Sequence, residues 1–341
     1  MRALLIGGTG TISTDITRLC VERGWDITLL NRGNRSGRLP DGMLVSQWSL
    51  DVNDEAAVAA RLEGEFFDVV VNFINYNVGE IERDIRLFAG KCLQYIFIST
   101  ASAYQKPRGH YMVTESTPLS NPHWAYSRDK IACEERLMVE YRDRAFPVTI
   151  VRPSHTYDKY KIPVCVHGGK GSWSTLKRML DGKPVLVVGD GSSHWPLTHS
   201  RDFAKGFIGL MGNIQAIGES VHITSDEALT WNQIYQAIGN ALGVVPKLAH
   251  VSTDFLVACS PEHEGPLHGD KSVSVVFDNS KIKRLSPGFA ATIRFDQGAR
   301  EAAEQYLNDP SLQIADPDFD RFTEAIINAQ NAAIDMVKGG F

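Results

Sequence analysis

The sequence predicts an α/β fold: a doubly wound parallel sheet followed by a smaller, mixed α/β C-terminal lobe. At the start of the chain an apolar run, Ala3–Ile6, leads into Gly7, Gly8 and Gly10 and then into a segment with helical spacing. Further apolar runs alternate with stretches of helical spacing, which is the pattern of parallel strands joined by crossover helices. These runs cover residues 26–30, 67–73, 94–99 and 147–151.

The glycine-rich turn predicts a dinucleotide site. Where Cβ atoms are missing, the backbone can approach a pyrophosphate, and the N-terminus of the following helix stabilises its charge. The third small position of the pattern is Ser13 instead of glycine or alanine, which still permits fairly close packing of helix on strand. The alternative is a strand-turn-helix that binds no ligand.

The end of the second strand bears on the choice of cofactor. An acid normally stands there and holds the ribose hydroxyls of NAD, but here the residue is Asn31, followed by Arg32. With Arg35 and Arg38 nearby, a guanidinium is available for the 2′-phosphate of NADP, so NADP is slightly favoured over NAD. A solvated basic loop is the alternative. Further on, Asp51 could accept a hydrogen bond from the adenine amino group.

The chemistry is expected on a helix over residues 123–141. Tyr126 and Lys130 lie four residues apart there, so the phenol and the ammonium share a face. The strand at 94–99 is followed by Thr100 and Ser102, and ligands of such sheets bind at the carboxyl ends of the strands. Tyr157 and Lys161 have the same spacing as the first pair, but they precede Pro163 and are assigned to a loop.

We divide the chain into a sheet domain, 1–155 with 196–225, and a substrate lobe, 156–195 with 226–341. A short strand at 221–223 is expected to rejoin the main sheet. Residues 258–271 are polar and predict a loop, whereas 318–337 predict a helix whose apolar stripe is a packing face. Further helices are expected at 78–88, 174–180, 202–211 and 231–242, with a short strand at 185–188.

Composition and charge indicate which kinds of partner the chain binds. The chain has 341 residues, 43% of them hydrophobic, and a formal net charge of −5 with its lysines and arginines scattered among acids. A soluble metabolite is therefore the expected partner, with no nucleic acid and no membrane. The five cysteines are far apart, and no spacing matches a metal site, so we expect reduced thiols and no metal. A cytoplasmic location is expected.

Taken together, these residues resemble the extended short-chain dehydrogenase/reductase superfamily, in particular its NAD-dependent epimerase/dehydratase family. The resemblance implies a Rossmann domain and a redox centre in which Tyr126 is the acid/base, Lys130 holds the nicotinamide ribose, and Thr100 binds the reacting oxygen. The motifs that carry it are GGTGTIS at 7–13, Asp51, FISTASAY at 97–104, Tyr126 with Lys130, RPSHTY at 152–157 and GDG at 189–191.

The resemblance also implies the cofactor and substrate contacts. The cofactor is expected on Gly7, Gly10, Thr11, Ile12, Asn31, Arg32, Asp51, Val52, Phe73, Tyr126, Lys130 and Pro153. The substrate is expected on Ser102, His155 and Trp195. Nucleotide-sugar members of the family usually have asparagine where His155 stands and arginine where Trp195 stands. We therefore expect a smaller or less anionic sugar or polyol than a nucleotide diphosphate sugar.

The expected function is NAD(P)-dependent hydride transfer of the epimerase/dehydratase type. Two alternatives remain: an NADP-dependent carbonyl reductase, and a non-catalytic dinucleotide-binding protein of the regulatory or RNA-associated kind. Family members commonly pair through the helices that correspond to 78–88 and 123–141, so a homodimer is expected.

Overall fold

The structure, a computed structural model, describes residues 1–32, 39 and 42–340, so the predicted basic residues Arg35 and Arg38 lie outside it. Its contacts divide the chain into two units. Unit 1 comprises Met1–Thr156, Thr198–Asp226 and Phe277–Thr292, and unit 2 comprises Tyr157–Leu197, Glu227–Val276 and Ile293–Phe341.

Unit 1 is built on a seven-stranded sheet with the order β11-β7-β5-β4-β1-β2-β3. All neighbouring strands are parallel, as expected of a Rossmann sheet. Ile6 is in register with both Leu30 and Asn72, so the ends of β1, β2 and β4 meet at one edge. The strands are β1 (Arg2–Ile6), β2 (Asp26–Asn31), β3 (Ser46–Ser49), β4 (Phe67–Asn72), β5 (Cys92–Ile98), β7 (Val148–Pro153) and β11 (Ser220–Ile223).

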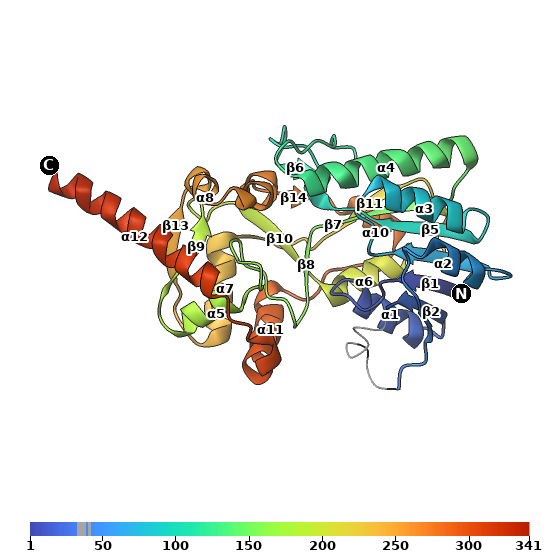
Figure 1. Cartoon of the computed structure of the whole chain (residues 1–341), viewed down its shortest axis with the longest axis horizontal. Helices are drawn as coiled ribbons and strands as arrows, with labels where there is room; N and C mark the ends of the chain where they lie inside the picture. Colours follow the sequence, from blue (N-terminus) through green and yellow to red (C-terminus); the bar gives the residue numbers. More distant parts are fainter. Residues whose placement is uncertain (33–38, 40–41, 341) are drawn as a thin grey trace. The chain divides into compact units, whose positions relative to one another are not determined.

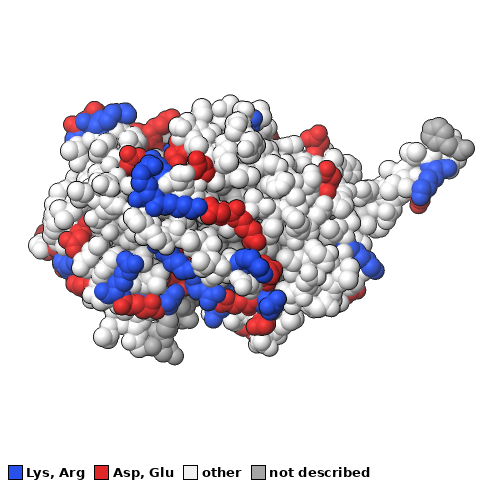
Figure 2. Space-filling view, turned by 180° about the vertical axis from the view of Figure 1, so that it is seen from behind, with Lys and Arg blue, Asp and Glu red and all other residues white. Residues whose placement is uncertain are grey.

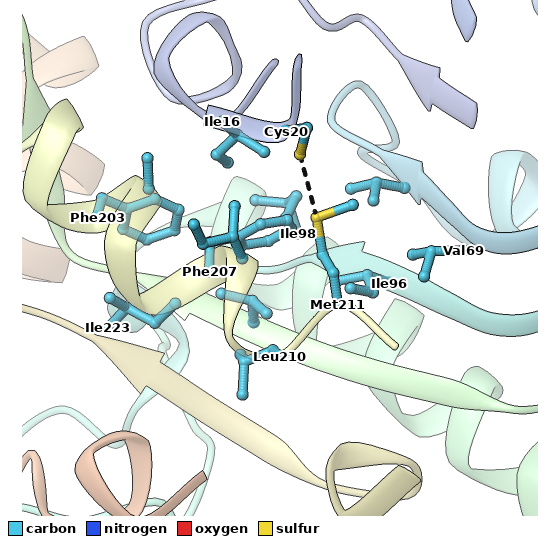
Figure 3. Close-up of a cluster of buried hydrophobic side chains, with 14 of the residues drawn as sticks. Ile16, Cys20, Val69, Ile96, Ile98, Phe203, Phe207, Leu210, Met211 and Ile223 are labelled. Atoms are coloured by element: carbon cyan, nitrogen blue, oxygen red, sulfur yellow. Dashed lines mark hydrogen bonds between the residues drawn. The ribbon is translucent and has the colours of Figure 1, made fainter. Parts of the chain in front are cut away.

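Helices cover both faces of this sheet (Figure 1). Because side chains alternate along a strand, Leu4 and Ile6 pack in one core with α2, α3 and α4, whereas Ala3 and Leu5 pack in the other with α1, α6 and α10. In that second core the sulfur atoms of Cys20 and Met211 lie 3.8 Å apart (Figure 3). The helices are α1 (Ser13–Glu22), α2 (Glu55–Arg61), α3 (Val78–Phe88), α4 (Ala125–Arg144), α6 (Ser200–Ile208) and α10 (Ser280–Leu285).

Two features of unit 1 bear on the sequence analysis. The strand predicted at 221–223 does join the main sheet, as β11 beside β7. Residues Phe277–Thr292, which the sequence analysis placed in the substrate lobe, belong instead to unit 1. The physical reason is burial: Ile282, Leu285 and Phe289 complete the core between the sheet and α6.

Unit 2 contains two small sheets and most of the remaining helices. β9 pairs in parallel with β13, and β10 pairs in antiparallel fashion with β12. Thr230 and Gln233 form a capping box at the start of α7, and Gly243 ends that helix with a left-handed φ of 72°. The elements of unit 2 are α5 (Trp173–Leu180), β9 (Pro184–Val188), β12 (Ala228–Thr230), α7 (Trp231–Leu242), β13 (Lys247–Val251), α8 (Thr253–Cys259), α9 (Glu264–Pro266), α11 (Phe295–Asn308) and α12 (Pro317–Gly339). Two strands, β8 (His155–Tyr157) and β10 (His194–His199), contain residues of both units.

The prediction of a loop at 258–271 is wrong. The segment is a series of short helical turns that ends in a π-helical turn at Leu267–Lys271, with Leu267 buried. Two prolines and two glycines interrupt it, so no helical periodicity of apolar residues appears in the sequence.

The packing face predicted along the C-terminal helix is correct only for its first half. Phe319 and Ile326 are buried in unit 2, but from residue 331 onward every residue up to 340 is exposed, including Met336. In Figure 1 this end of α12 projects beyond the other helices of its unit. The apolar spacing continues into the second half of α12, but no other described element of the unit covers those residues. Among the described helices, none combines the length and the apolar character needed to cross a lipid bilayer.

Candidate active site

The glycine-rich turn between β1 and α1 is closed by Ser13. The Ser13 hydroxyl donates to the carbonyl oxygen of Gly7 and accepts from the amide of Gly10, both at 2.8 Å. Gly7 has φ +80°, and a Cβ there would lie 2.7 Å from the side chain of Ile74. The residue that departed from the glycine pattern therefore stabilises the turn, because it forms hydrogen bonds with one carbonyl group and one amide of the turn itself.

A cavity of about 780 Å³ opens in front of this turn. Its volume suits a dinucleotide-sized ligand, and the close backbone at Gly7 is the kind of surface that a pyrophosphate requires. Tyr76, Glu80 and Asn53 also line it and were not identified from the sequence. The predicted cofactor residues that line it are Gly7, Gly10, Thr11, Ile12, Asn31, Arg32, Asp51, Val52 and Phe73.

Several polar residues that line the cavity come from the end of β2 and the loop after β3. Asn31 is the last residue of β2, and the exposed Arg32 follows it directly. Asp51 accepts a hydrogen bond from the amide of Asn53 at 2.9 Å and remains exposed. Asp54 instead accepts from Ala57 at 3.1 Å and caps α2.

Lys130 stands one turn beyond Tyr126 on α4 and is only 2% exposed. Its ammonium group donates to the carbonyl oxygen of Ile98 at 2.7 Å and also to that of Asn75. The Nζ atom lies 4.8 Å from the ring centre of Tyr76 and 5.9 Å from that of Tyr126. Burial lowers the pKa of Lys130 to about 8.

Thr100 is held beside α4 by a chain of hydroxyl groups. Its Oγ1 lies 2.9 Å from the Oγ of Ser102, which lies 2.7 Å from the Oγ of Ser127, the residue after Tyr126. Ser102 is 4% exposed and its hydroxyl already bridges two others. In this structure Ser102 supports Thr100, and its expected contact with substrate stays a prediction.

Behind these residues lies a buried ion pair that the sequence analysis missed. Glu134, four residues after Lys130, is bonded to the Arg152 guanidinium at the end of β7, with N–O distances of 2.5, 2.9 and 3.1 Å. Glu134 also accepts from the hydroxyl of Ser99, the residue before Thr100. The ion pair thereby ties α4 to the ends of β5 and β7. A charged residue on the buried face of a helix was the available sequence signal.

The same network continues through Tyr104 and His222. The Nε2 atom of His222 lies 2.7 Å from the carbonyl oxygen of Asp278, so we assign its proton to Nε2. The other ring nitrogen then accepts from the Tyr104 hydroxyl at 3.0 Å, and that hydroxyl accepts from Arg152 at 3.2 Å. Burial raises the pKa of Tyr104 and lowers that of His222, which keeps both neutral.

The second tyrosine–lysine pair is not on a helix. Tyr157 ends β8, is fully buried and packs edge-on against Phe295 in unit 2, with ring centres 5.4 Å apart. A Cβ at position 298 would lie 2.1 Å from its hydroxyl, so Gly298 makes room for this ring. Lys161 closes the following turn by donating its amide to Asp158. Tyr157 therefore has a packing role and lies on a strand instead of in the expected loop, whereas Lys161 is exposed.

The other predicted site residues lie on strands. Pro153, expected at the cofactor, is the buried last residue of β7, and His155 begins β8. Trp195 is only 2% exposed and stacks on Trp231 within unit 2, with ring centres 5.8 Å apart. This corrects the expectation that Trp195 offers an open face to a substrate, because its faces are covered by packing. No group of three metal-ligating side chains occurs among the described residues.

Comparisons with known proteins agree with this geometry. Residues 3–224 match the NAD dependent epimerase/dehydratase family. The chain is 26% identical to a 2'-dehydrokanamycin reductase of Streptomyces kanamyceticus, over 85% of this chain and 80% of that protein. It is 25% identical to the chloroplast stem-loop binding protein of 41 kDa b of Arabidopsis thaliana, over 73% of this chain and 65% of that protein.

A solved structure gives the same fold. A dTDP-glucose 4,6-dehydratase from Bacillus anthracis in complex with NAD matches with a TM-score of 0.73 at 18% identity, covering 92% of this chain and 98% of that one.

Proposed function

Since this chain belongs to the NAD-dependent epimerase/dehydratase family, we propose that it transfers hydride at a carbinol carbon of a sugar or polyol-like metabolite, with Thr100, Tyr126 and Lys130 as its catalytic residues. The observation that carries the proposal is their arrangement. The phenol and the buried ammonium share one face of α4, and the hydroxyl chain through Ser102 and Ser127 holds Thr100 beside that helix.

Each residue has a defined part in such a reaction. When a carbinol is oxidised, the Tyr126 phenolate would accept its O–H proton, and a dinucleotide held in the cavity would supply the hydride acceptor. The Thr100 hydroxyl donates a hydrogen bond to the reacting oxygen. The ammonium of Lys130 favours the phenolate form of Tyr126, because a positive charge nearby lowers the free energy of the anion. Return of the hydride to the opposite face of the carbonyl would complete an epimerisation, whereas release of the carbonyl product would leave a net oxidation.

The decisive variant is Tyr126→Phe, compared with Tyr157→Phe. We expect Tyr126→Phe to lower kcat by about a hundredfold or more, the contribution of a general acid/base, with dinucleotide affinity nearly unchanged. Tyr157→Phe should keep most of the activity, since its hydroxyl lies in the packing of unit 2. Equal turnover by Tyr126→Phe and the wild type would rule out the assignment.

For the cofactor we propose that NADP binds at least as well as NAD. Asn31 carries no charge to repel a 2′-phosphate, and Arg32, exposed at the cavity, can pair with one. Titration of both dinucleotides against wild type, Arg32→Ala and Asn31→Asp tests this: both changes should weaken NADP more than NAD. An unchanged NADP affinity in Arg32→Ala would make Arg32 a solvated loop residue only.

For the substrate we propose a sugar, glycoside or other polyol that is not a nucleotide diphosphate sugar. The position at which related enzymes usually carry an arginine is Trp195, an indole without positive charge. A diphosphate buried without a cation costs several kcal/mol. A panel of UDP- and dTDP-sugars beside free sugars, glycosides and nucleosides tests the proposal, and efficient turnover of a diphosphate sugar alone would contradict it.

A carbonyl reductase is the second candidate, favoured by the similarity to a protein named as a 2'-dehydrokanamycin reductase. The two candidates differ in how they treat the cofactor. An enzyme that recycles its dinucleotide internally should retain it through purification, whereas a reductase must exchange it at each turnover. Mass spectrometry of the purified protein distinguishes them.

A non-catalytic RNA-associated role is the remaining alternative, since one relative is named as a stem-loop binding protein. Charge argues against it: the net charge is −5, and on the face shown in Figure 2 basic and acidic side chains lie interspersed. Gel-shift titration with a stem-loop RNA tests this; saturable binding at about physiological salt would support the RNA-associated role.

We also propose a cytoplasmic homodimer that pairs through α3 and α4. These helices are held together by an ion pair between Glu82 and Arg136, with an N–O distance of 2.5 Å. Sedimentation equilibrium at micromolar concentration should give twice the chain mass, and a monomer would contradict the proposal. Cell fractionation tests the location.

A further inference from the structure

We propose that Tyr76 and Trp124 form a stacking site for a pyranose ring beside the catalytic phenol. We call these two rings together with Tyr126 the aromatic wall. The proposal rests on the proposed function, because it assigns the part of the site that recognises the sugar. It adds where the sugar ring binds and how it is recognised, which the catalytic residues do not specify.

The aromatic wall brings together rings from separate parts of unit 1. The ring centres of Trp124 and Tyr126 lie 5.0 Å apart, and those of Tyr76 and Tyr126 lie 6.4 Å apart. Tyr76 follows β4 and Trp124 immediately precedes α4. Tyr76 is 50% exposed, and the other two rings are partly exposed. The wall therefore presents aromatic surface at the position where the phenol must meet its substrate.

Hydrogen bonds at two helix starts hold the backbone beneath these rings. Beside Tyr76, the Glu80 carboxylate accepts from the amides of Tyr76 and Asn77, and the Asn77 side chain caps α3. Before Trp124, the Arg128 guanidinium donates to the carbonyl oxygens of residues 121 and 122 at 3.3 and 2.8 Å. Because both segments are held before a ligand arrives, little further ordering is needed for binding.

The two cations beside the wall, Arg128 and Lys130, donate to backbone groups of the protein. Lys130 lies 4.8 Å from the Tyr76 ring, but its ammonium group donates to two backbone carbonyl groups. Arg128 also donates to backbone carbonyl oxygens. The aromatic faces carry partial negative charge, which attracts the polarised C–H groups on the face of a pyranose and also a cationic amino substituent.

The test measures binding of defined probes to the full-length protein saturated with NADP+ or NAD+, whichever binds more tightly. The probes are methyl α-D-glucopyranoside, kanamycin and UDP-glucose, and their binding is measured by isothermal titration calorimetry. The variants are Tyr76→Ala and Trp124→Ala, with Tyr76→Phe as the conservative change. Tyr111→Ala is the matched control, because Tyr111 is 65% exposed in the same unit and no ring of the wall contacts it among the described contacts.

We expect at least one of the two glycosides to bind, and each alanine variant of the wall to weaken it about tenfold, the usual scale of one lost stacking ring. Tyr76→Phe and Tyr111→Ala should bind it nearly as wild type does, and Trp124→Ala should leave dinucleotide affinity nearly unchanged. Because Tyr76 also lines the dinucleotide cavity, Tyr76→Ala should weaken the glycoside more than the dinucleotide. Binding of UDP-glucose alone, no saturable glycoside binding, or glycoside affinity unchanged in both alanine variants would overturn the proposal.

Two further outcomes separate this proposal from the proposed function. If Tyr76→Ala weakens the dinucleotide as much as the glycoside, the wall serves the cofactor and the stacking site is refuted, while the catalytic assignment stands. If the glycoside binds through the wall but Tyr126→Phe turns over like wild type, the stacking site stands and the catalytic assignment fails.

Discussion

Lys130 offers a direct test of the site's electrostatics that needs no substrate. Its pKa falls from an ordinary value of 10.5 to about 8 because burial disfavours the charged form. Between those two values the unfolded chain binds more protons than the folded chain, so this residue makes stability rise with pH. Below pH 8 its destabilising effect is fully present. A difference of 2.5 pKa units, taken from the same two values, corresponds to about 3 kcal/mol.

The perturbation is Lys130→Met, measured by urea unfolding of the ligand-free protein. The lost hydrogen bonds to Ile98 and Asn75 contribute nearly the same amount at every pH. Only the titration of Lys130 therefore makes the difference in free energy of unfolding between the two proteins depend on pH. From about pH 7 to about pH 9.5, wild type should gain about 2 kcal/mol relative to Lys130→Met. The control is Lys177→Met, a half-exposed lysine of unit 2.

The result that would refute this reasoning is a constant difference in free energy of unfolding between wild type and Lys130→Met across that pH range. It would mean that Lys130 titrates in the folded protein as it does in the unfolded chain. The expected result has a functional meaning under the proposed function: the protein would carry a destabilising buried charge beside the phenol whose ionisation that charge is proposed to assist.

Two stability predictions follow from packing in unit 1. Glu134→Gln should lower the free energy of unfolding by about 3–5 kcal/mol, because Arg152 would remain buried without its carboxylate, and chemical denaturation that shows a loss below about 1 kcal/mol would contradict the buried ion pair. Gly8→Ala should destabilise by about 1–3 kcal/mol, because the new Cβ would lie 2.6 Å from the Leu29 side chain. Gly169→Ala is its control, since nothing lies within 4 Å of that position, and equal melting temperatures of both variants would refute the overpacking argument.

Local patterns in the sequence were sufficient for most of the elements of unit 1. The helix at Val78–Phe88 has the predicted bounds, because its apolar spacing, its cap and its end all lie within a few residues of one another. The shared face of Tyr126 and Lys130 follows from helix geometry alone once α4 is a helix. The turn at Gly7 was equally readable, since the strand, the glycines and the helix are contiguous.

Pairings between distant residues could not be predicted in this way. The Glu134 and Arg152 ion pair joins a helix to a strand end, and neither residue's spacing in the sequence indicates the other. Ser102 was correctly placed after β5, but its partner Ser127 comes from α4, so its supporting role was not visible. Trp195 was judged by its chemical character, whereas its burial depends on Trp231.

The sequence by itself therefore determined most of the strands and helices of unit 1 and the shared helix face of Tyr126 and Lys130, because backbone periodicity and helix geometry act over a few residues. Tertiary structure alone decided which side chains are covered. Residues Phe277–Thr292 belong to unit 1 because their apolar side chains complete its core. The apolar stripe on α12 extends beyond the residues that pack against it, so its second half is exposed. Burial is a property of neighbours brought together by the fold, and a one-dimensional pattern does not contain the identity of those neighbours.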